Sequence, residues 1–200
     1  MRDAGVEQTD DGETIVPYYD EARQVVVCKI ICDSRSWWAP PGREILPLGV
    51  ERLPHSSWIA ARAALLVVEG ESDCLAAREA FVEGDARTLC WYVLGVPGSN
   101  VWRPTWRKYL APFVRVYVCG DGDLAGSRLN DAVRSSVPWA RVVELPEGED
   151  VRSILQRDGR EGLMPYLEAA DVDARLAAAL ALAPDLDTFV ALLREGDEQL

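Results

Sequence analysis

The sequence has no long hydrophobic run. None of its apolar stretches reaches the roughly 18 residues that a membrane-spanning helix needs. The first residues, Met1-Arg2-Asp3-Ala4, lead into a polar, acidic segment that is unlike the apolar stretch of a signal peptide. We therefore expect a cytoplasmic protein with no membrane partner. Since 48% of the residues are hydrophobic, the chain can still build a folded core.

Cysteine and histidine are scarce. The five cysteines are odd in number, and most lie inside apolar runs, where a reduced thiol packs as a small hydrophobe. Cys28 and Cys32 could begin a zinc knuckle, but no second pair of cysteines or histidines follows, and His55 is the only histidine. The sequence therefore argues against both a disulfide framework and a zinc site.

Positive charge is also in short supply. The chain has 21 lysines and arginines against 33 aspartates and glutamates, a formal net charge of -12 at pH 7. Proteins that grip nucleic acid over a broad surface rely on lysine and arginine, so any such contact here must be local. A carboxylate cluster that holds divalent cations would neutralise part of the excess, because bound metals are often the largest local charges in a site.

Three common catalytic motifs are missing as well. No glycine-rich loop ends in Gly-Lys-Ser or Gly-Lys-Thr, which argues against a P-loop ATPase. The chain has neither the Gly-x-Ser-x-Gly elbow of serine hydrolases nor the His-Glu-x-x-His of zinc proteases.

The most informative stretch is an apolar run that stops at two aspartates. Residues 114–118 are mostly β-branched or aromatic and predict a buried strand, and Gly120 and Gly122 allow the chain to turn directly after it. Asp121 and Asp123 would then lie at the carboxyl end of the strand, where open parallel sheets bind ligands. Two carboxylates there suit Mg²⁺ or Mn²⁺. The alternative is an Asp-Gly turn in a hairpin.

Three further apolar runs predict strands that are separated by helices. The predicted strands cover residues 63–68, 89–94 and 141–145, and the helices are expected at 75–81, with Ser72 or Asp73 as cap, at 104–109 and at 124–134. Four apolar strands with helical crossovers describe an α/β fold with a parallel sheet.

Acidic residues follow three of the four predicted strands: Glu69, Asp121 with Asp123, and Asp150. Carboxylates brought into one cleft repel one another, so the arrangement is costly unless cations neutralise it. We therefore expect one or two divalent ions, Mg²⁺ or Mn²⁺, which can clamp a nucleoside triphosphate and support displacement at phosphorus. Glu69, alone on its strand, is also a candidate general acid or base.

Upstream of this sheet, two β-branched runs predict a hairpin. Residues 14–17 and 24–31 flank a polar turn, and a loop of aromatic and cationic residues follows at 35–43. Trp37 and Trp38 in this loop either stack on single-stranded nucleic acid or cover the small sheet against its neighbour.

Two further features could bind phosphate groups. Arg103, Arg107 and Lys108 form the densest basic cluster, which contacts phosphates or else belongs to a solvated helix face. The helix predicted at 124–134 would begin beside the two aspartates, where its dipole and free amides favour a bound phosphate.

The last part of the chain, from residue 159, is rich in alanine and leucine and predicts helices. Its apolar positions include Leu176, Leu180, Val190 and Leu193, which pack onto the sheet or onto another protein. Packing within the chain is the simpler expectation.

Two segments resemble the Toprim signature shared by primases, topoisomerases and some nucleases. They are Val68-Glu69-Gly70-Glu71-Ser72-Asp73 and, further along the chain, Asp121-Gly122-Asp123-Leu124-Ala125-Gly126. The resemblance covers residues 62–158. It implies a Toprim-like fold, with a parallel four-stranded sheet flanked by helices, and a site in which Glu69, Asp121 and Asp123 are catalytic and bind metal.

Further motifs are similar to those of bacterial and phage primases. Gly126 and Arg128 continue the Asp-Gly-Asp-x-Ala-Gly-x-Arg/Lys run of that family, and the segment 145–150 is similar to its Pro-x-Gly-x-Asp segment. The second similarity implies that Asp150 joins the metal site. Arg152 and Ser153 stand where many relatives carry a second Asp or Asn.

The residues before the core resemble the small sheet of phage primases and primase-helicases. The similar segments are Val16-Pro17-Tyr18-Tyr19-Asp20-Glu21 and Val25-Val26-Val27-Cys28-Lys29. In that family the small sheet and the core flank a groove for template and nascent RNA, which implies contacts for Lys29, Arg35 and Arg43. The candidate nucleic-acid or nucleotide ligands are then Lys29, Arg35, Arg43, Arg103, Arg107, Lys108 and Arg128.

The resemblance divides the chain into three parts: an amino-terminal β-rich subdomain at 13–58, a Toprim catalytic domain at 59–158 and a helical tail at 159–200. The zinc-binding module and the helicase P-loop that accompany such primases are absent from the sequence. Template recognition would then come from a partner such as a separate zinc-binding module, from another chain or from a missing region. Docking of the tail onto a replicative helicase is a hypothesis that the lack of a helicase in this chain motivates.

The resemblance implies a primase core that makes short RNA primers on single-stranded DNA from ribonucleoside triphosphates, with Mg²⁺ or Mn²⁺, in a bacterial or phage-infected cell. A Toprim nuclease would use the same carboxylates to hydrolyse phosphodiesters. A noncatalytic module that binds nucleic acid or a replisome partner is a third alternative. The primase-like small sheet favours the first.

Overall fold

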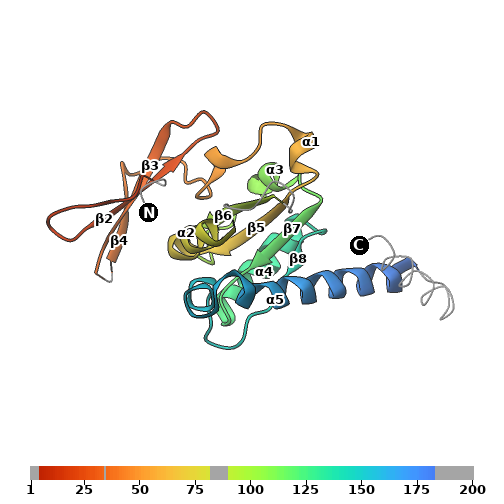
Figure 1. Cartoon of the computed structure of the whole chain (residues 1–200). Helices are drawn as coiled ribbons and strands as arrows, with labels where there is room; N and C mark the ends of the chain where they lie inside the picture. The colour runs from red at the N-terminus through yellow and green to blue at the C-terminus, as the bar shows by residue number, and fades with distance from the viewer. Residues whose placement is uncertain (1–4, 34, 82–89, 183–200) are drawn as a thin grey trace.

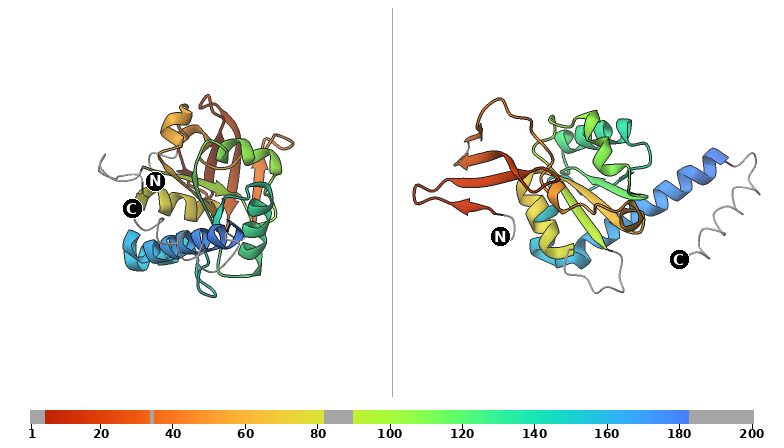
Figure 2. Two further views of the ribbon diagram at one scale, coloured as in Figure 1. Left: turned by 90° about the vertical axis from the view of Figure 1, so that its right-hand side faces the viewer. Right: turned by 90° about the horizontal axis from the view of Figure 1, so that it is seen from above.

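The computed structural model describes residues 5–33, 35–81 and 90–182. They form a three-layer α/β core with a small antiparallel sheet beside it (Figure 1). A long carboxyl-terminal helix runs along the core and extends beyond it, as two further views show (Figure 2). None of the described helices is long and apolar enough to cross a membrane.

Four parallel strands in the order β6-β5-β7-β8 form the core sheet. Their bounds are Ala64–Glu69 (β5), Trp91–Val96 (β6), Arg115–Cys119 (β7) and Arg141–Val142 (β8). β5 is central, and its residues 64–68 are fully buried because helices cover both faces of the sheet. All three strand pairs are parallel, which confirms the predicted sheet, although β8 is shorter than the strand expected at 141–145.

Alternate residues of β5 pack against different helices. Leu66 and Val68 join the hydrophobic core under α2 (Gly70–Phe81) and α5 (Val151–Leu182). Leu65 and Val67 face the opposite core. That core is covered by η3 (Pro104–Trp106), α3 (Arg107–Leu110) and α4 (Leu124–Ser136). The helices predicted at 104–109 and 124–134 are therefore confirmed.

Helix α2 begins at Gly70, directly after the last residue of β5, rather than near residue 75 as the sequence predicts. Gly70 has a φ of 76°, a conformation that suits glycine and turns the chain from strand to helix without a loop. Ser72 and Asp73, the expected caps, therefore lie inside the first turn. The sequence Glu-Gly-Asp at 83–85 predicts the end of this helix, and it lies outside the described residues.

The small sheet contains four antiparallel strands in chain order. They are β1 (Glu7–Gln8), β2 (Thr14–Tyr19), β3 (Val25–Cys32) and β4 (Arg35–Ala39). β2 and β3 form the predicted hairpin. The loop expected at 35–43 is wrong in its first half, because β3 offers backbone partners to residues 35–39 and aromatic residues fit a pleated, half-buried strand.

The two tryptophans of β4 face opposite sides of the small sheet because side chains alternate along a strand. The Trp38 ring packs edge-on against Tyr18, with ring centroids 5.1 Å apart, and belongs to the core under α2. The Trp37 side chain is 42% exposed. Trp38 therefore covers the small sheet against its neighbour. Trp37 stays a candidate for stacking on a nucleobase.

Replacing these tryptophans singly separates the two roles. Trp38→Ala is expected to lower the free energy of unfolding by about 3 kcal/mol, since it removes a packed aromatic ring. Trp37→Ala should cost less than about 1 kcal/mol, as an exposed side chain does. Urea unfolding followed by circular dichroism measures both. Equal losses in the two variants would contradict the assignment of faces.

The segment between the small sheet and β5 packs onto the core. It includes η2 (Val50–Arg52) and α1 (Ser57–Ala60). Leu48 and Gly95 of β6 exchange two backbone hydrogen bonds, of 2.8 and 2.9 Å, and Leu48 is buried. This contact holds the small sheet next to the core.

Helix α5 runs through the boundary predicted at residue 159. Gly159, with a φ of 66°, breaks the helical geometry where two helices join. Beyond this break, Leu163, Leu167 and Ala170 are buried in the core with α2. Residues 163–170 of the tail therefore pack within the chain.

Asp171 anchors the outer half of α5. The carboxylate of Asp171 accepts hydrogen bonds of 2.9 Å from the hydroxyl of Tyr117 and pairs with Arg141 at 2.9 Å. Further out, Leu176 is 44% exposed. Leu180, Val190 and Leu193, also expected to pack, lie outside the residues whose side chains the structure describes.

Candidate active site

The carboxyl ends of β5 and β7 bring the predicted acidic residues to one edge of the core sheet. The register pairs Val68 with Cys119, so Glu69 at the end of β5 lies level with the turn that carries Asp121. Because α2 and α4 start directly after these strand ends, their first turns also lie at this edge. The predicted placement of these acidic residues at one sheet edge matches the observed topology, and their role as a site stays a prediction.

Two glycines allow the close packing of the turn after β7. A Cβ on Gly122 would lie 1.9 Å from the carbonyl oxygen of Pro146, and one on Gly126 would lie 2.0 Å from the carbonyl oxygen of Asp121. The amide of Gly122 also donates a 2.8 Å hydrogen bond to the carbonyl of Glu149. The Asp-Gly-Asp turn is therefore fixed between α4 and the segment before α5, and the hairpin alternative is wrong.

Asp123 caps helix α4. Its Oδ1 atom accepts hydrogen bonds from the amides of Ala125 and Gly126, at 2.7 and 2.8 Å. The side chain is exposed, and its second oxygen lies outside this cap. Since the cap uses two of the helix amides, these two amides are not available to a phosphate. The phosphate site expected at this helix end therefore has fewer free amide donors.

Crowding of carboxylates perturbs the site. Burial raises the pKa of Asp121 to about 7, and the charges of four neighbours add to the shift: Glu69, Asp73, Asp150 and Asp123. Burial also raises the pKa of Glu69, although the amide of Ser99, 3.1 Å from Oε1, favours the ionised form. Ionised carboxylates are thus costly here in the absence of a cation.

The structure adds Asp73 to this group. It is four residues after Glu69 in the first turn of α2, its side chain is only 4% exposed, and burial raises its pKa to about 6. Its Oδ1 atom accepts a 2.9 Å hydrogen bond from the amide of Arg152 at the start of α5. The signal in the sequence is the four-residue spacing from Glu69, which becomes informative only once the helix begins at Gly70.

Asp73→Asn should weaken Mn²⁺ binding about tenfold, because it removes a buried charge beside the proposed ligands while keeping the oxygen that Arg152 contacts. Glu79→Gln, an exposed change on the same helix, is the control and should leave Mn²⁺ affinity unchanged. Electron paramagnetic resonance of free Mn²⁺ measures both. Equal affinities for Asp73→Asn and the wild type would exclude Asp73 from the site.

Asp150 lies at the start of α5. Its Oδ1 atom accepts a 2.5 Å hydrogen bond from the amide of Ser153, and Oδ2 lies 3.8 Å from the Arg152 guanidinium. The residue is close enough for its charge to raise the pKa of Asp121 and of Asp73. Its assignment as a metal ligand stays a prediction.

The donor set fits a hard divalent cation with an open coordination sphere. Glu69 Oε2 is buried and has no hydrogen-bond partner among the described residues, which leaves it available to a ligand. No three acidic, histidine or cysteine side chains in the described ranges already stand at metal-binding distances. Mg²⁺ commonly takes one or two carboxylates and completes its shell with water and substrate phosphates, so a Mg²⁺ site at these residues stays a prediction.

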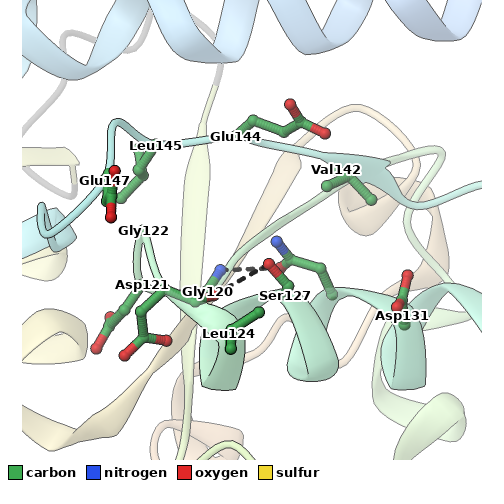
Figure 3. Close-up of a pocket in the computed structure, with 12 residues that line it drawn as sticks. Gly120, Asp121, Gly122, Leu124, Ser127, Asp131, Val142, Glu144, Leu145 and Glu147 are labelled. Atoms are coloured by element: carbon green, nitrogen blue, oxygen red, sulfur yellow. Dashed lines mark hydrogen bonds between the residues drawn. The ribbon is translucent and has the colours of Figure 1, made fainter.

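A cavity of about 460 Å³ opens beside the Asp-Gly-Asp turn, between α4 and the segment after β8 (Figure 3). Asp121, Ser127 and Glu147 are among the residues that line it. The cavity therefore offers room for a ligand next to Asp121. Its acidic lining favours a ligand that arrives with cations.

The basic cluster of the sequence analysis is spread over η3, α3 and aromatic neighbours. Each side chain lies over a ring: Arg103 over Trp106, Arg107 over Trp139 and Lys108 over Tyr109, at 5.9, 5.3 and 4.6 Å. Lys108 also pairs with Glu21 at 3.5 Å. All three basic residues are exposed, and phosphate contact stays a prediction for them.

The other predicted nucleic-acid ligands differ in exposure. Arg35, Arg43 and Arg128 are exposed, on β4, the loop after it and α4. The amino group of Lys29 is instead bound to Glu71, at 2.8 and 3.0 Å from its two oxygens, and its side chain is only 15% exposed. A nucleic-acid contact by Lys29 stays a prediction, but the structure gives the residue a different partner.

Comparison with known proteins finds a curated sequence relative and several similar solved structures. No protein-family model matches the sequence. The Gene 57 protein of Mycobacterium phage D29 is 32% identical over 101 residues, which are 50% of this chain and 60% of that protein. The chain therefore spans about 60% of the length of the curated relative it matches.

Two solved structures are similar to the whole architecture. The primase fragment of the bacteriophage T7 primase-helicase protein has a TM-score of 0.63 at 18% identity and covers 83% of this chain and 68% of its own. The DnaG primase catalytic domain bound to single-stranded DNA has a TM-score of 0.58 at 18% identity and covers 97% and 75%. The chain thus has the fold of the phage and bacterial DNA primase catalytic core.

Proposed function

We propose that this chain is the catalytic core of a DNA primase, which joins ribonucleoside triphosphates into short RNA primers on single-stranded DNA. The observation that carries the proposal is the crowding of Glu69, Asp73 and Asp121 at one edge of a Toprim-like sheet, where the pKa of Asp121 is about 7. Carboxylates this close require a cation when they ionise, and the primase-core fold is the context for its use on nucleotides.

Glu69, Asp121 and Asp123 would hold Mg²⁺ or Mn²⁺, with Asp150 as a further ligand. Such an ion, when bound, would offset the negative charge of the triphosphate and of the leaving pyrophosphate. The two aspartates keep their places because the turn between them is packed against α4 and hydrogen-bonded to the segment before α5. A rigid turn of this kind positions a ligand without a cost of reorganisation.

Glu69 has a second possible task. Its Oε1 atom is held by the amide of Ser99. Its Oε2 atom, which has no hydrogen-bond partner in the described part of the chain, is available either to the cation or to the proton of the attacking hydroxyl. A raised pKa suits a group that accepts a proton near neutral pH.

The small sheet would contribute to template binding. Trp37, Arg35 and Arg43 are exposed on it or just after it, and they supply one ring for stacking and two charges for phosphates. The similar DnaG domain was solved with single-stranded DNA, and the similar T7 protein is a primase-helicase. We therefore propose single-stranded DNA as the template, with a zinc-binding template reader and a replicative helicase as partners.

The test supplies labelled ribonucleotides, mixed-sequence single-stranded DNA and Mg²⁺ or Mn²⁺, and resolves the products on a denaturing gel. Short RNA that requires the template supports a primase. Shortened template without RNA would replace the proposal with a Toprim nuclease. Neither product, from protein that still binds Mn²⁺, would make the chain a noncatalytic binding module.

A further inference from the structure

Two side chains of the small sheet reach the first turn of α2. The ammonium group of Lys29 on β3 lies 2.8 and 3.0 Å from the two oxygens of Glu71. The hydroxyl of Tyr18 on β2 donates to Glu71 Oε1. Tyr18 is fully buried and Glu71 is 9% exposed, so water competes little for these contacts.

Glu71 occupies the position midway between two residues of the candidate site. It follows Glu69 by two residues and precedes Asp73 by two. Residues two apart in an α-helix project about 200° apart around its axis. Glu71 therefore projects toward the small sheet while Asp73 projects toward the carboxylates.

The joint between β5 and α2 is a single glycine, and its carbonyl oxygen packs against β6, where a Cβ on Gly95 would lie 2.8 Å from it. Gly70, the single residue between Glu69 and Glu71, has a φ of 76°, and no atom outside its own neighbours lies within 4 Å of where its Cβ would be. A glycine in such open space permits several backbone directions. Side-chain contacts of the residues that follow Gly70 therefore contribute to fixing the rotation of the first turn.

We propose that Glu71 is a positioning residue for the metal site: Lys29 and Tyr18 hold its carboxylate, and this contact sets the first turn of α2 so that Glu69 and Asp73 face the cation. The small sheet thereby acts on the site through α2 as well as through any contact with the template. The inference rests on the proposed divalent-metal site and names a role for Lys29 and Tyr18 in it.

Lys29→Met separates positioning from simple electrostatics. The change removes a positive charge near the site, so electrostatic attraction alone would make Mn²⁺ bind more tightly. Loss of positioning would instead make Mn²⁺ bind more weakly. We expect Mn²⁺ affinity to fall about tenfold, as it does when a residue that orients metal ligands is removed.

The assay titrates Mn²⁺ into the full chain and measures the free ion by electron paramagnetic resonance, with thermal unfolding recorded in parallel. Lys29→Arg should keep near-wild-type affinity because it preserves the ion pair. Tyr18→Phe removes only the hydroxyl and should weaken Mn²⁺ binding less than Lys29→Met does, so it decides the matter if Lys29→Met does not fold. Glu21→Gln is the matched control, since it breaks the exposed pair between Glu21, in the β2–β3 turn of the same sheet, and Lys108 of α3, and should leave the affinity unchanged.

Unchanged or tighter Mn²⁺ binding by folded Lys29→Met would overturn the inference, even if its melting temperature fell, because a purely structural contact loses stability alone. If Lys29→Met does not fold, unchanged binding by Tyr18→Phe would overturn it. The proposed function fails separately, when the wild type binds Mn²⁺ but makes no RNA. A weaker response of Lys29→Met to single-stranded DNA, with Mn²⁺ binding intact, would return Lys29 to the role of a nucleic-acid ligand and also overturn the inference.

Discussion

Asp121→Asn should abolish RNA synthesis while making the metal-free protein more stable. We expect a loss of roughly 1,000-fold in ribonucleotide incorporation, since the change removes the charge of a proposed metal ligand from the centre of the site. Above its pKa of about 7 the aspartate is ionised among other carboxylates, and asparagine relieves this repulsion. After allowance for solvent screening, the gain in the free energy of unfolding is on the order of 1 kcal/mol at pH 8 without metal.

Differential scanning fluorimetry in EDTA and the primer assay measure the two effects on the same sample. Glu79→Gln removes an exposed acidic charge elsewhere and should change neither. A stabilised but inactive Asp121→Asn variant is the signature of a carboxylate kept for function at a cost in stability. Full activity in this variant would remove Asp121 from the metal site.

Gly126→Ala should disrupt the site without touching any carboxylate. The added methyl group would lie 2.0 Å from the carbonyl oxygen of Asp121 and 2.3 Å from its amide nitrogen, and backbone cannot yield as a flexible side chain does. The turn must move, and a displacement near 1 Å can cost about 100-fold in rate. Overpacking should also lower the free energy of unfolding by about 3 kcal/mol.

The control for this glycine is Gly12→Ala. Gly12 has a φ of 83°, so alanine is strained there by about 1 kcal/mol, but no atom lies within 4 Å of the new methyl group and the residue is far from the site in sequence. Its primer synthesis should stay at the wild-type level. Wild-type activity in a folded Gly126→Ala variant would show that the turn tolerates movement, against the rigid geometry described above.

The Asp-Gly-Asp turn is predictable from the sequence because local signals agree there. A mostly β-branched and aromatic strand, glycines that permit a sharp turn and acidic residues after it all indicate a strand end at a ligand-binding edge. The position of Glu69 at the end of a buried strand is predictable from the same signals. The parallel sheet is predictable too, since strands buried on both faces have a distinctive composition.

Asp73 and β4 could not be predicted in this way, because tertiary packing decides both. Ser72 and Asp73 are good helix caps, so local preference favours a later helix start than the one that Gly70 allows. The tryptophans of β4 become a strand because β3 lies beside them. The ion pair of Lys29 could not be predicted either. Its partner Glu71 is 42 positions away, on a helix of the core, and no local pattern indicates that pair.

Ribonucleotide incorporation after metal removal tests the central claim most directly. The wild-type protein is stripped with EDTA, dialysed and assayed on single-stranded DNA as Mn²⁺ is added back. The carboxylate site predicts no RNA before addition and a saturable return of short RNA with Mn²⁺, at a concentration that matches Mn²⁺ binding to the site. RNA synthesis that persists in EDTA, or that returns equally in Asp121→Asn, would contradict a metal-dependent site at this edge of the sheet.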